Sequence, residues 1–274
     1  ILTDVTGVQT CALPISESFG VVRELAPNAL LIGNLGAAQF SDHAGFGENE
    51  LQKAIQMVKA DAMAIHVNPA QELVQIEGDV CFSGFFRRVA HLAERVSVPV
   101  ILKEVGSGFC REDAAMVQDS CLSGIDVGGT GGTSWVGVEA LLAGKKEDRL
   151  RNEIGKTFWN WGIPTALSVL EARSAMNKTL IATGGVRNGL DAAKLIALGA
   201  DLVGMALPFL KAAKQGPEEV EFLVQRFYHE LRVAMCLAGC RTLPELRKIP
   251  VVVTGHSLSW IEQRGLKLPG TFSR

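Results

Sequence analysis

The sequence predicts an α/β fold with a parallel sheet, arranged as a TIM (β/α)8 barrel in which six of the eight βα units are recognisable. Two observations predict it. Short apolar runs alternate with amphipathic stretches from Ser18 onward, and the runs are apolar almost throughout, as strands covered on both faces are. Because the connections are short and right-handed, successive strands should be neighbours in the sheet.

The elements follow one another along the chain. Strands are expected at Ala29–Asn34, Ala62–Val67, Pro99–Lys103, Gly124–Val127, Thr179–Thr183 and Asp201–Ala206. Helices are expected between them at Glu48–Lys59, Phe85–Arg95, Glu112–Ser120 and Gly189–Leu198. A longer amphipathic helix is expected at Pro217–Ala238, since Pro217 stands at its start and Gly239 follows its end.

Two stretches do not fit the repeating pattern. The connection 128–178 is too long for a plain βα loop, and such long loops are often functional. It carries three tryptophans and the turn signal Gly162-Ile163-Pro164. The tail Arg241–Arg274 is not assigned to any element. The charge run Lys145–Arg151 is interpreted as a solvated face.

The beginning of the chain is treated apart from the fold. Ile1–Ser16 shows no period of either kind and looks like translated sequencing-adapter read-through, with an irregular native N-terminus as the alternative. We therefore expect a non-native leader over residues 1–16 and a partial barrel domain over residues 17–274. A closed barrel needs eight strands, so two N-terminal units are expected to be absent and the sheet to have open edges.

Composition restricts the function classes. The 27 Lys and Arg residues nearly balance 29 Asp and Glu residues, so no global field favours nucleic acid or an anionic membrane. Any anionic ligand must then be held locally. Six cysteines without a metal-ligand spacing fit a reduced cytosolic protein, and Cys236 and Cys240 are expected to be small buried hydrophobes. No apolar run is long enough to cross a bilayer core of about 30 Å.

The strongest chemical motif is Gly184-Gly185-Val186-Arg187, followed by the run Leu198–Gly204. The glycines let backbone amides approach a phosphate, and the helix that follows points its positive N-terminal end at it. A tight turn is the alternative for the glycine pair alone. Together the segments are similar to the flavin-phosphate site of the FMN-dependent barrel enzymes, which include α-hydroxy-acid oxidases and type 2 isopentenyl-diphosphate isomerase.

A second glycine-rich run, from Gly128 to Trp135, directly follows a predicted strand. A flexible loop is one interpretation. The other is a nest of N–H groups that binds the phosphate together with the Thr133 hydroxyl. The oxidases carry a catalytic histidine at this place, and none occurs here. The Gly-Gly-Thr-Ser-Trp segment instead resembles that of the isomerases.

The third motif runs from His66 to Glu72. Pro69 disfavours helix at Asn68, so the polar residues are expected on a turn above the strand end. Glu72 offers the hard oxygen that Mg²⁺ prefers. The stretch resembles the isomerase signature, which implies His66, Asn68 and Gln71 as catalytic residues, Gln71 as a substrate contact and Glu72 as a Mg²⁺ ligand. A surface loop, with a structural role for His66, is the alternative.

Lys103 ends an apolar strand, where burying an unpaired lysine would be costly, so it should face an anion. A salt bridge to Glu104 or Asp126 is the alternative. The resemblance implies that Lys103 and Asn34 hold the flavin ring. It also implies a cofactor-binding role, on the phosphate and ribityl side, for Gly128, Thr133, Gly184, Gly185, Val186, Arg187, Ala206 and Leu207.

The resemblance extends from about Phe19 to Gly265, with the motifs in the family's order. It implies reversible isomerisation of isopentenyl diphosphate to dimethylallyl diphosphate in isoprenoid biosynthesis, with reduced FMN as the acid or base. NADPH as reductant and Mg²⁺ are implied as well. The family also implies a cytoplasmic homo-oligomer, a tetramer or octamer, acting on a small diphosphate.

Several family features have no counterpart in this chain. The N-terminal basic residues, an early Ser-Met-Thr-Gly-Gly flavin loop and a Gly-Ser-Gln segment are missing, and Gly128 stands where the family often has a hydroxyl. We therefore expect the 274 residues alone to bind FMN poorly. The alternatives are an FMN-dependent α-hydroxy-acid oxidase or dehydrogenase, and an inactive barrel fragment.

Overall fold

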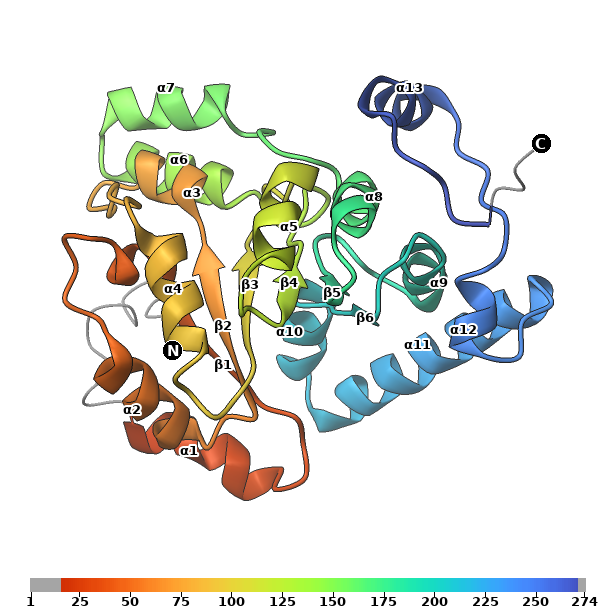
Figure 1. Ribbon diagram of the computed structural model, residues 1–274, viewed down its shortest axis with the longest axis horizontal. Coiled ribbons are helices and arrows are strands. Elements are labelled where there is room, and N and C mark those ends of the chain that lie inside the picture. Colours follow the sequence, from red (N-terminus) through yellow and green to blue (C-terminus); the bar gives the residue numbers. More distant parts are fainter. Residues whose placement is uncertain (1–15, 271–274) are drawn as a thin grey trace.

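The computed structural model describes residues 16–270, and its core is a six-stranded parallel sheet in the order β1-β2-β3-β4-β5-β6 (Figure 1). The expected leader at 1–16 lies outside the described residues, apart from Ser16. The strands are β1 Ile32–Gly36, β2 Ala62–Val67, β3 Val100–Glu104, β4 Gly124–Asp126, β5 Thr179–Ala182 and β6 Leu202–Val203. All six strands and their order are as predicted, although β1 begins three residues late and β6 keeps only two residues of ladder.

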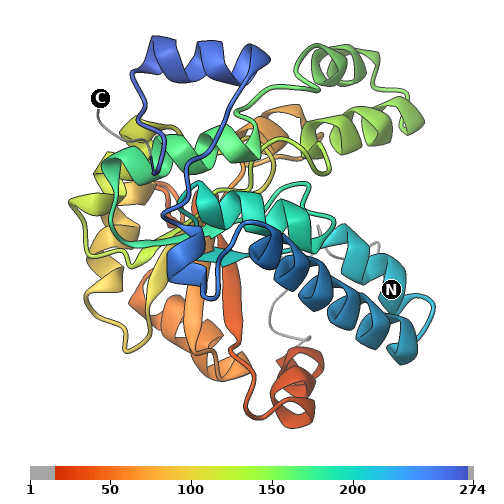
Figure 2. The same ribbon diagram turned by 90° about the vertical axis from the view of Figure 1, so that its right-hand side faces the viewer.

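Helices follow the strands and cover the outer side of the sheet (Figure 1). Four were expected and lie within a residue or two of their predicted bounds: α2 Glu48–Val58, α4 Phe85–Ala93, α5 Arg111–Gln118 and α9 Gly189–Ala197. The long helix α11 spans Pro217–Leu237 and packs beside α9 (Figure 2). Further elements are α1 Ser16–Leu25, the 3-10 helix η2 Ala37–Phe40, α3 Pro69–Val74 and α10 Leu207–Ala213.

The stretch after β4 is helical rather than a long loop, which corrects the sequence-based expectation. It holds α6 Trp135–Lys145, α7 Arg149–Thr157 and α8 Thr165–Ala175. α6 begins where the Ser134 hydroxyl accepts a hydrogen bond from the amide of Gly137 at 3.0 Å. The predicted turn at Gly162 remains as the link between α7 and α8. The charged segment 145–151 is largely exposed, as expected.

The sheet has two open edges in the described part of the chain. No described strand pairs with the outer side of β1 or of β6. Edge residues are correspondingly accessible, with Ile32 41% and Leu202 49% exposed. The expectation that every strand is covered on both faces is therefore wrong at the edges, while the open sheet edges that were expected are present among the described residues.

The central strands form the core. Met63, Ile65, Ile125 and Leu180 are each 0% exposed and pack against the helices outside the sheet. Burial of such side chains contributes about 1.5–3 kcal/mol each, so β2 to β5 form a rigid platform. The rigid central strands therefore set the positions and directions of the polar residues at their ends.

The C-terminal tail, unassigned from sequence, packs on the barrel, and one buried carboxylate makes several of its contacts. The tail contains α12 Leu243–Leu246 and α13 Gly255–Arg264. Glu171 on α8 is 0% exposed and accepts hydrogen bonds from Trp260 Nε1 at 2.9 Å and from Arg264 Nε at 2.8 Å. Arg264 also reaches Glu112 on α5 at 2.6 Å. These contacts fasten α13 across α5 and α8.

Two other expectations concern cysteines and membranes. Cys240 is buried as expected, but Cys236 is exposed on α11, because that helix buries only one narrow side. Among the described residues, no helix is both long enough and apolar enough to cross a bilayer.

Candidate active site

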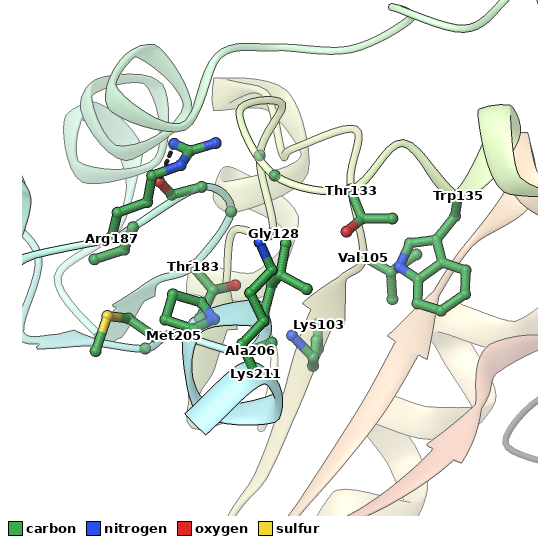
Figure 3. A pocket seen from close by; sticks show the side chains of 18 of the residues that line it. Lys103, Val105, Gly128, Thr133, Trp135, Thr183, Arg187, Met205, Ala206 and Lys211 are labelled. Carbon is green, nitrogen blue, oxygen red and sulfur yellow. Dashed lines mark hydrogen bonds between the residues drawn. The ribbon is translucent and has the colours of Figure 1, made fainter. Parts of the chain in front are cut away.

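A cavity of about 890 Å³ opens at the carboxyl ends of the strands, and all six strand ends contribute to it. Figure 3 shows part of its lining, with Lys103 from the end of β3 and with Thr183 and Arg187 from the loop after β5. Every expected site residue except Asn68 lines it, namely Asn34, His66, Gln71, Glu72, Lys103, Gly128, Thr133, Gly184, Gly185, Val186, Arg187, Ala206 and Leu207. Asn68 is buried beside it and lines a small adjoining pocket together with Gln71.

Two glycine loops pack backbone against backbone on one side of this cavity. Gly184 and Gly185 have φ values of +105° and +83°, a left-handed region that favours glycine. A Cβ added at Gly185 would overlap the carbonyl of Gly131 in the other loop. The Thr165 hydroxyl donates to the Gly184 carbonyl at 2.7 Å and ties α8 to the same place. No residue with a side chain could take these positions without moving the loops.

The amides of Gly184, Gly185 and Val186 donate to no acceptor in the part of the chain that the structure describes. They lie just before α9, whose N-cap Asn188 accepts from the amide of Asp191 at 2.8 Å. Arg187 lies over the loops, donating to the carbonyls of Gly185 at 2.6 Å and Gly131 at 3.1 Å. Free amides, a helix N-terminus and a guanidinium together fit a phosphate group. The glycine pair thus forms a tight turn, and its backbone amides remain available to donate to a ligand.

Lys103 lies on the cavity floor and pairs with Asp126 on the neighbouring strand, with Nζ 2.8 Å from Oδ2. The salt bridge considered as the alternative is therefore present, with Asp126 rather than Glu104, and Lys103 faces the cavity as well. Glu104 instead accepts hydrogen bonds from the amides of Val105, Gly106, Ser107 and Gly108. Burial raises the pKa of Glu104 to about 7 although these hydrogen bonds lower it.

His66 is buried at the end of β2, with Nδ1 3.3 Å from Oδ1 of Asn34. Burial, followed by the positive charge of Lys103, lowers the pKa of His66 to about 4. The imidazole is therefore neutral near pH 7. It offers the cavity a hydrogen-bonding group without a charge.

Replacing His66 is expected to change how stability depends on pH. The folded pKa lies below the unfolded value of about 6.5, so the unfolded chain takes up a proton that the native chain resists. The contribution of His66 to the free energy of unfolding is fully present above pH 6.5. It falls by about 3 kcal/mol as the pH drops toward 4. His66→Gln should lose this decline. Glu104 titrates between pH 4.5 and 7 with the opposite sign, but it does so in both proteins and cancels in the difference.

Urea unfolding of both proteins at several pH values between 4 and 7.5 measures this difference. Parallel stability curves for His66→Gln and the unmodified chain would contradict the assignment of a neutral, buried imidazole.

The third motif folds into a helix, so the expected turn is wrong. Pro69 begins α3, where its missing N–H costs nothing, and Asn68 is the residue before it. Helical geometry brings Asn68 Nδ2 to 2.8 Å from Oε1 of Glu72. Gln71 Nε2 donates to Oε1 of Glu139 on α6 at 2.9 Å. Asn68, Gln71, Glu72 and Glu139 form one buried polar group beside the cavity.

Glu139 was not predicted from the sequence. It is the one charged residue in the stretch Trp135–Gly144, and this is a signal that could have drawn attention to it, because a carboxylate in an apolar helix needs a partner. Burial raises the pKa of Glu139, while the hydrogen bond from Gln71 lowers it. The outer wall of the cavity was also missed. It is formed by α10, α11 and the link between them, through Lys211, Gln215, Phe222, Leu223 and Arg226.

Glu72 is a candidate metal ligand that does not belong to a larger cluster of ligating side chains among the described residues. No group of three or more His, Cys, Asp or Glu side chains suited to a metal occurs among residues 16–270. Oε1 of Glu72 accepts from Asn68 and Oε2 accepts from the amide of Asp79 at 2.8 Å, which leaves further lone pairs on each oxygen. This donor set fits an ion such as Mg²⁺ that keeps its waters and is bridged by a ligand's phosphates.

The fold and the cavity together define a parallel α/β-barrel enzyme that holds a phosphate-bearing ligand at its strand ends. Comparison with known proteins agrees. The family described as FMN-dependent dehydrogenase matches residues 38–252. The fold also resembles mandelate oxidase bound to (S)-mandelic acid, with a TM-score of 0.52 at 18% identity over 85% of this chain and 74% of that chain.

Curated relatives give the finer assignment. The isopentenyl-diphosphate delta-isomerase of Methanothermobacter thermautotrophicus is 46% identical over 253 residues, covering 92% of this chain and 68% of that protein. The enzyme of the same name from Methanosarcina barkeri is 46% identical over 252 residues, with the same coverage. The chain belongs to the FMN-dependent dehydrogenase family and shares its closer kinship with the isopentenyl-diphosphate delta-isomerases.

Proposed function

We propose that this chain is the barrel part of an isopentenyl-diphosphate delta-isomerase, which interconverts isopentenyl and dimethylallyl diphosphate with reduced FMN in isoprenoid biosynthesis. The observation that carries the proposal is the 46% identity to such enzymes over 92% of the chain. The glycine-rich loop from Gly128 to Trp135 supports it, since this loop contains no histidine and so lacks the residue expected of the oxidases.

The cavity suits FMN in size and in the placement of its donors. Its volume of about 890 Å³ lies in the range of cofactor pockets. The amides of Gly184, Gly185 and Val186 would bind the phosphate, with Arg187 and Thr133 beside them. Lys103 and Asn34 would face the ring, while Ala206 and Leu207 would pack along the ribityl chain. When bound, reduced FMN supplies a nitrogen acid or base able to move a proton at an unactivated carbon.

The protein's own residues position the substrate. Gln71 is fixed at its amide nitrogen by Glu139 and at its oxygen by Asn68 Nδ2 at 3.4 Å, so the side chain cannot rotate freely. We assign it the substrate contact. Neutral His66 lines the same wall and hydrogen-bonds without adding charge. Glu72 would hold Mg²⁺, which would offset part of the negative charge of the diphosphate.

Glu139→Gln is expected to lower turnover about 10- to 100-fold, because the new amide can donate as well as accept and no longer fixes Gln71 in one orientation. Its neutral side chain keeps the shape, so stability should change little. The control is Glu153→Gln on α7, whose carboxylate pairs with Lys156 at the surface. Steady-state kinetics of the completed enzyme measure the effect. Equal turnover for Glu139→Gln and the unmodified enzyme would contradict this role.

We extend the proposal to the conditions of turnover. The reaction has no net redox change, so NADPH is needed only to reduce the flavin and not in each cycle. A homo-oligomer is supported by exposed apolar side chains on α11 outside the cavity, including Tyr228 at 64% and Val233 at 56% exposure. The protein is proposed to act in the cytoplasm.

The proposal is tested on a chain extended at the β1 edge, by supplying isopentenyl diphosphate, FMN, NADPH and Mg²⁺ and following product formation by NMR. Dimethylallyl diphosphate is the expected product, and omission of either FMN or the reductant should abolish it. Oxidation of a small hydroxy acid with release of hydrogen peroxide would instead support an oxidase and reject the isomerase. Complete absence of turnover in a chain extended at the β1 edge would support an inactive fragment.

A further inference from the structure

A buried carboxylate joins three successive strand ends beneath the cavity. Asp126 on β4 is 6% exposed and accepts from Lys103 Nζ at 2.8 Å. Its other oxygen accepts from the Thr183 hydroxyl at 2.5 Å and from the amide of Gly128 at 3.4 Å. Both oxygens of Asp126 therefore accept hydrogen bonds within the protein, and Asp126 is not among the residues that line the cavity.

Strand register sets this arrangement. Lys103 and Asp126 are direct partners in the β3–β4 ladder, so their side chains leave the sheet on the same side. Asp126 pairs with Ile181 on β5, and Thr183 follows two residues later, again on that side. The three side chains are thus placed by the rigid central strands and not by a loop. Figure 3 shows the side chains of Lys103 and Thr183 among the residues that line the cavity.

The pairing changes what Lys103 offers to a ligand. An ammonium group has three N–H donors, and Asp126 takes one of them. The side chain is 31% exposed and lines the cavity, so the remaining donors face it. With the carboxylate beside it, the ammonium presents donors but little net charge. It therefore favours an oxygen or nitrogen of a polar ring over a phosphate, whose full charge is better matched by the glycine loops and Arg187.

We infer that Asp126, locked by Thr183, is a positioning residue that holds Lys103 on the cavity floor and offsets its charge. The pair thereby fixes the ligand's direction, with the ring over Lys103 and the phosphate at Gly184 and Gly185. The ring is that of FMN, and this part of the inference rests on the proposed function. The pairing itself is a property of the chain without any ligand.

The test measures the reactivity of Lys103 in the chain as it exists. Acetic anhydride labelling is followed by mass spectrometry at several pH values, in the absence and presence of inorganic phosphate. Asp126→Asn keeps the shape of the side chain and removes its charge. Thr183→Val removes only the hydrogen bond from the Thr183 hydroxyl to Asp126. Asp201→Asn is the matched control, because it makes the same change in the ion pair to Arg173, which joins α8 to the residue before β6.

In Asp126→Asn, Lys103 should be acetylated about tenfold faster, since the partner that holds the ammonium is lost. Phosphate should then protect Lys103 from acetylation, which it should not do in the unmodified chain. Thr183→Val should show both effects to a smaller degree, and Asp201→Asn neither. The protection by phosphate separates a change of ligand preference from a mere loss of structure.

Unchanged labelling of Lys103 in a folded Asp126→Asn chain, with no protection by phosphate, overturns the inference. Circular dichroism and thermal unfolding establish that the variant is folded. If Asp126→Asn does not fold, Thr183→Val decides by the same two readouts, because it keeps both charges. FMN takes no part in this experiment, so a failure of the isomerase assay and a failure of the Lys103 pairing are seen separately.

Discussion

Joining two further βα units to the open edge at β1 is expected to raise the affinity of this chain for FMN by about 10²- to 10³-fold. The six described strands leave one side of the cavity without strand ends, between β1 and β6. A pocket that buries most of its ligand gains from each added wall, and two or three hydrogen bonds at about 1–1.5 kcal/mol each account for the increase. The 274 residues alone should therefore bind FMN weakly.

Fluorescence titration of FMN measures both affinities. The added units can be taken from the part of the Methanothermobacter thermautotrophicus relative that this chain does not match, since the match covers 68% of that protein. Fusion of an unrelated domain of equal length is the control, and it should leave FMN binding weak. Stoichiometric, tightly held FMN on the 274-residue chain by itself would contradict the claim that the open edge lowers the affinity for FMN.

Gly185→Ala is expected to abolish phosphate and FMN binding and to destabilise the fold by about 2–5 kcal/mol. Its φ of +83° is strained for alanine, and the new methyl group would overlap the carbonyl of Gly131. The two glycine loops must then separate, so the free amides of Gly184 and Val186 no longer point at a common centre. Urea unfolding and FMN titration together measure the loss.

Gly255→Ala is the control that separates the effect of a positive φ from the effect of the overlap with Gly131. Gly255 has a φ of +64°, but a Cβ there would meet nothing within 4 Å. This variant should lose about 1–2 kcal/mol of stability and keep its ligand affinity. If the two alanine variants behaved alike, close packing of the glycine loops could not be what forms the phosphate site.

The sequence predicted the sheet well because the physics of its strands is local. Met63, Ile65, Leu102 and Ile125 stand in apolar runs that only a strand covered on both faces would bury, and they are indeed in the core. The edges differed because burial depends on neighbours, and Ile32 is as apolar as its buried counterparts yet 41% exposed. The helices after β4 were missed because their aromatic and glycine residues resemble a loop.

The site was predicted as a list of residues, and the structure adds their pairing. Strand ends that meet at one side of a parallel sheet are foreseeable, and almost every expected residue lines the cavity. Which partner each side chain takes depends on register and helix position, which a single sequence does not fix. Glu139 hydrogen-bonds to Gln71 although the two residues are 68 positions apart in the sequence. Strand register likewise pairs Lys103 with Asp126 and not with Glu104. Pro69 does keep Asn68 out of the helix, as predicted, but it also starts α3, so the residues after it form a helix and not the expected turn.

The most direct test of this account is a flavin measurement on a chain completed at its β1 edge. Such a protein is expected to purify with bound FMN, seen in its visible absorbance, and after reduction to convert isopentenyl diphosphate into dimethylallyl diphosphate. A completed and folded protein that stays colourless and takes up no FMN from solution would contradict the claim that these six strand ends form a flavin site.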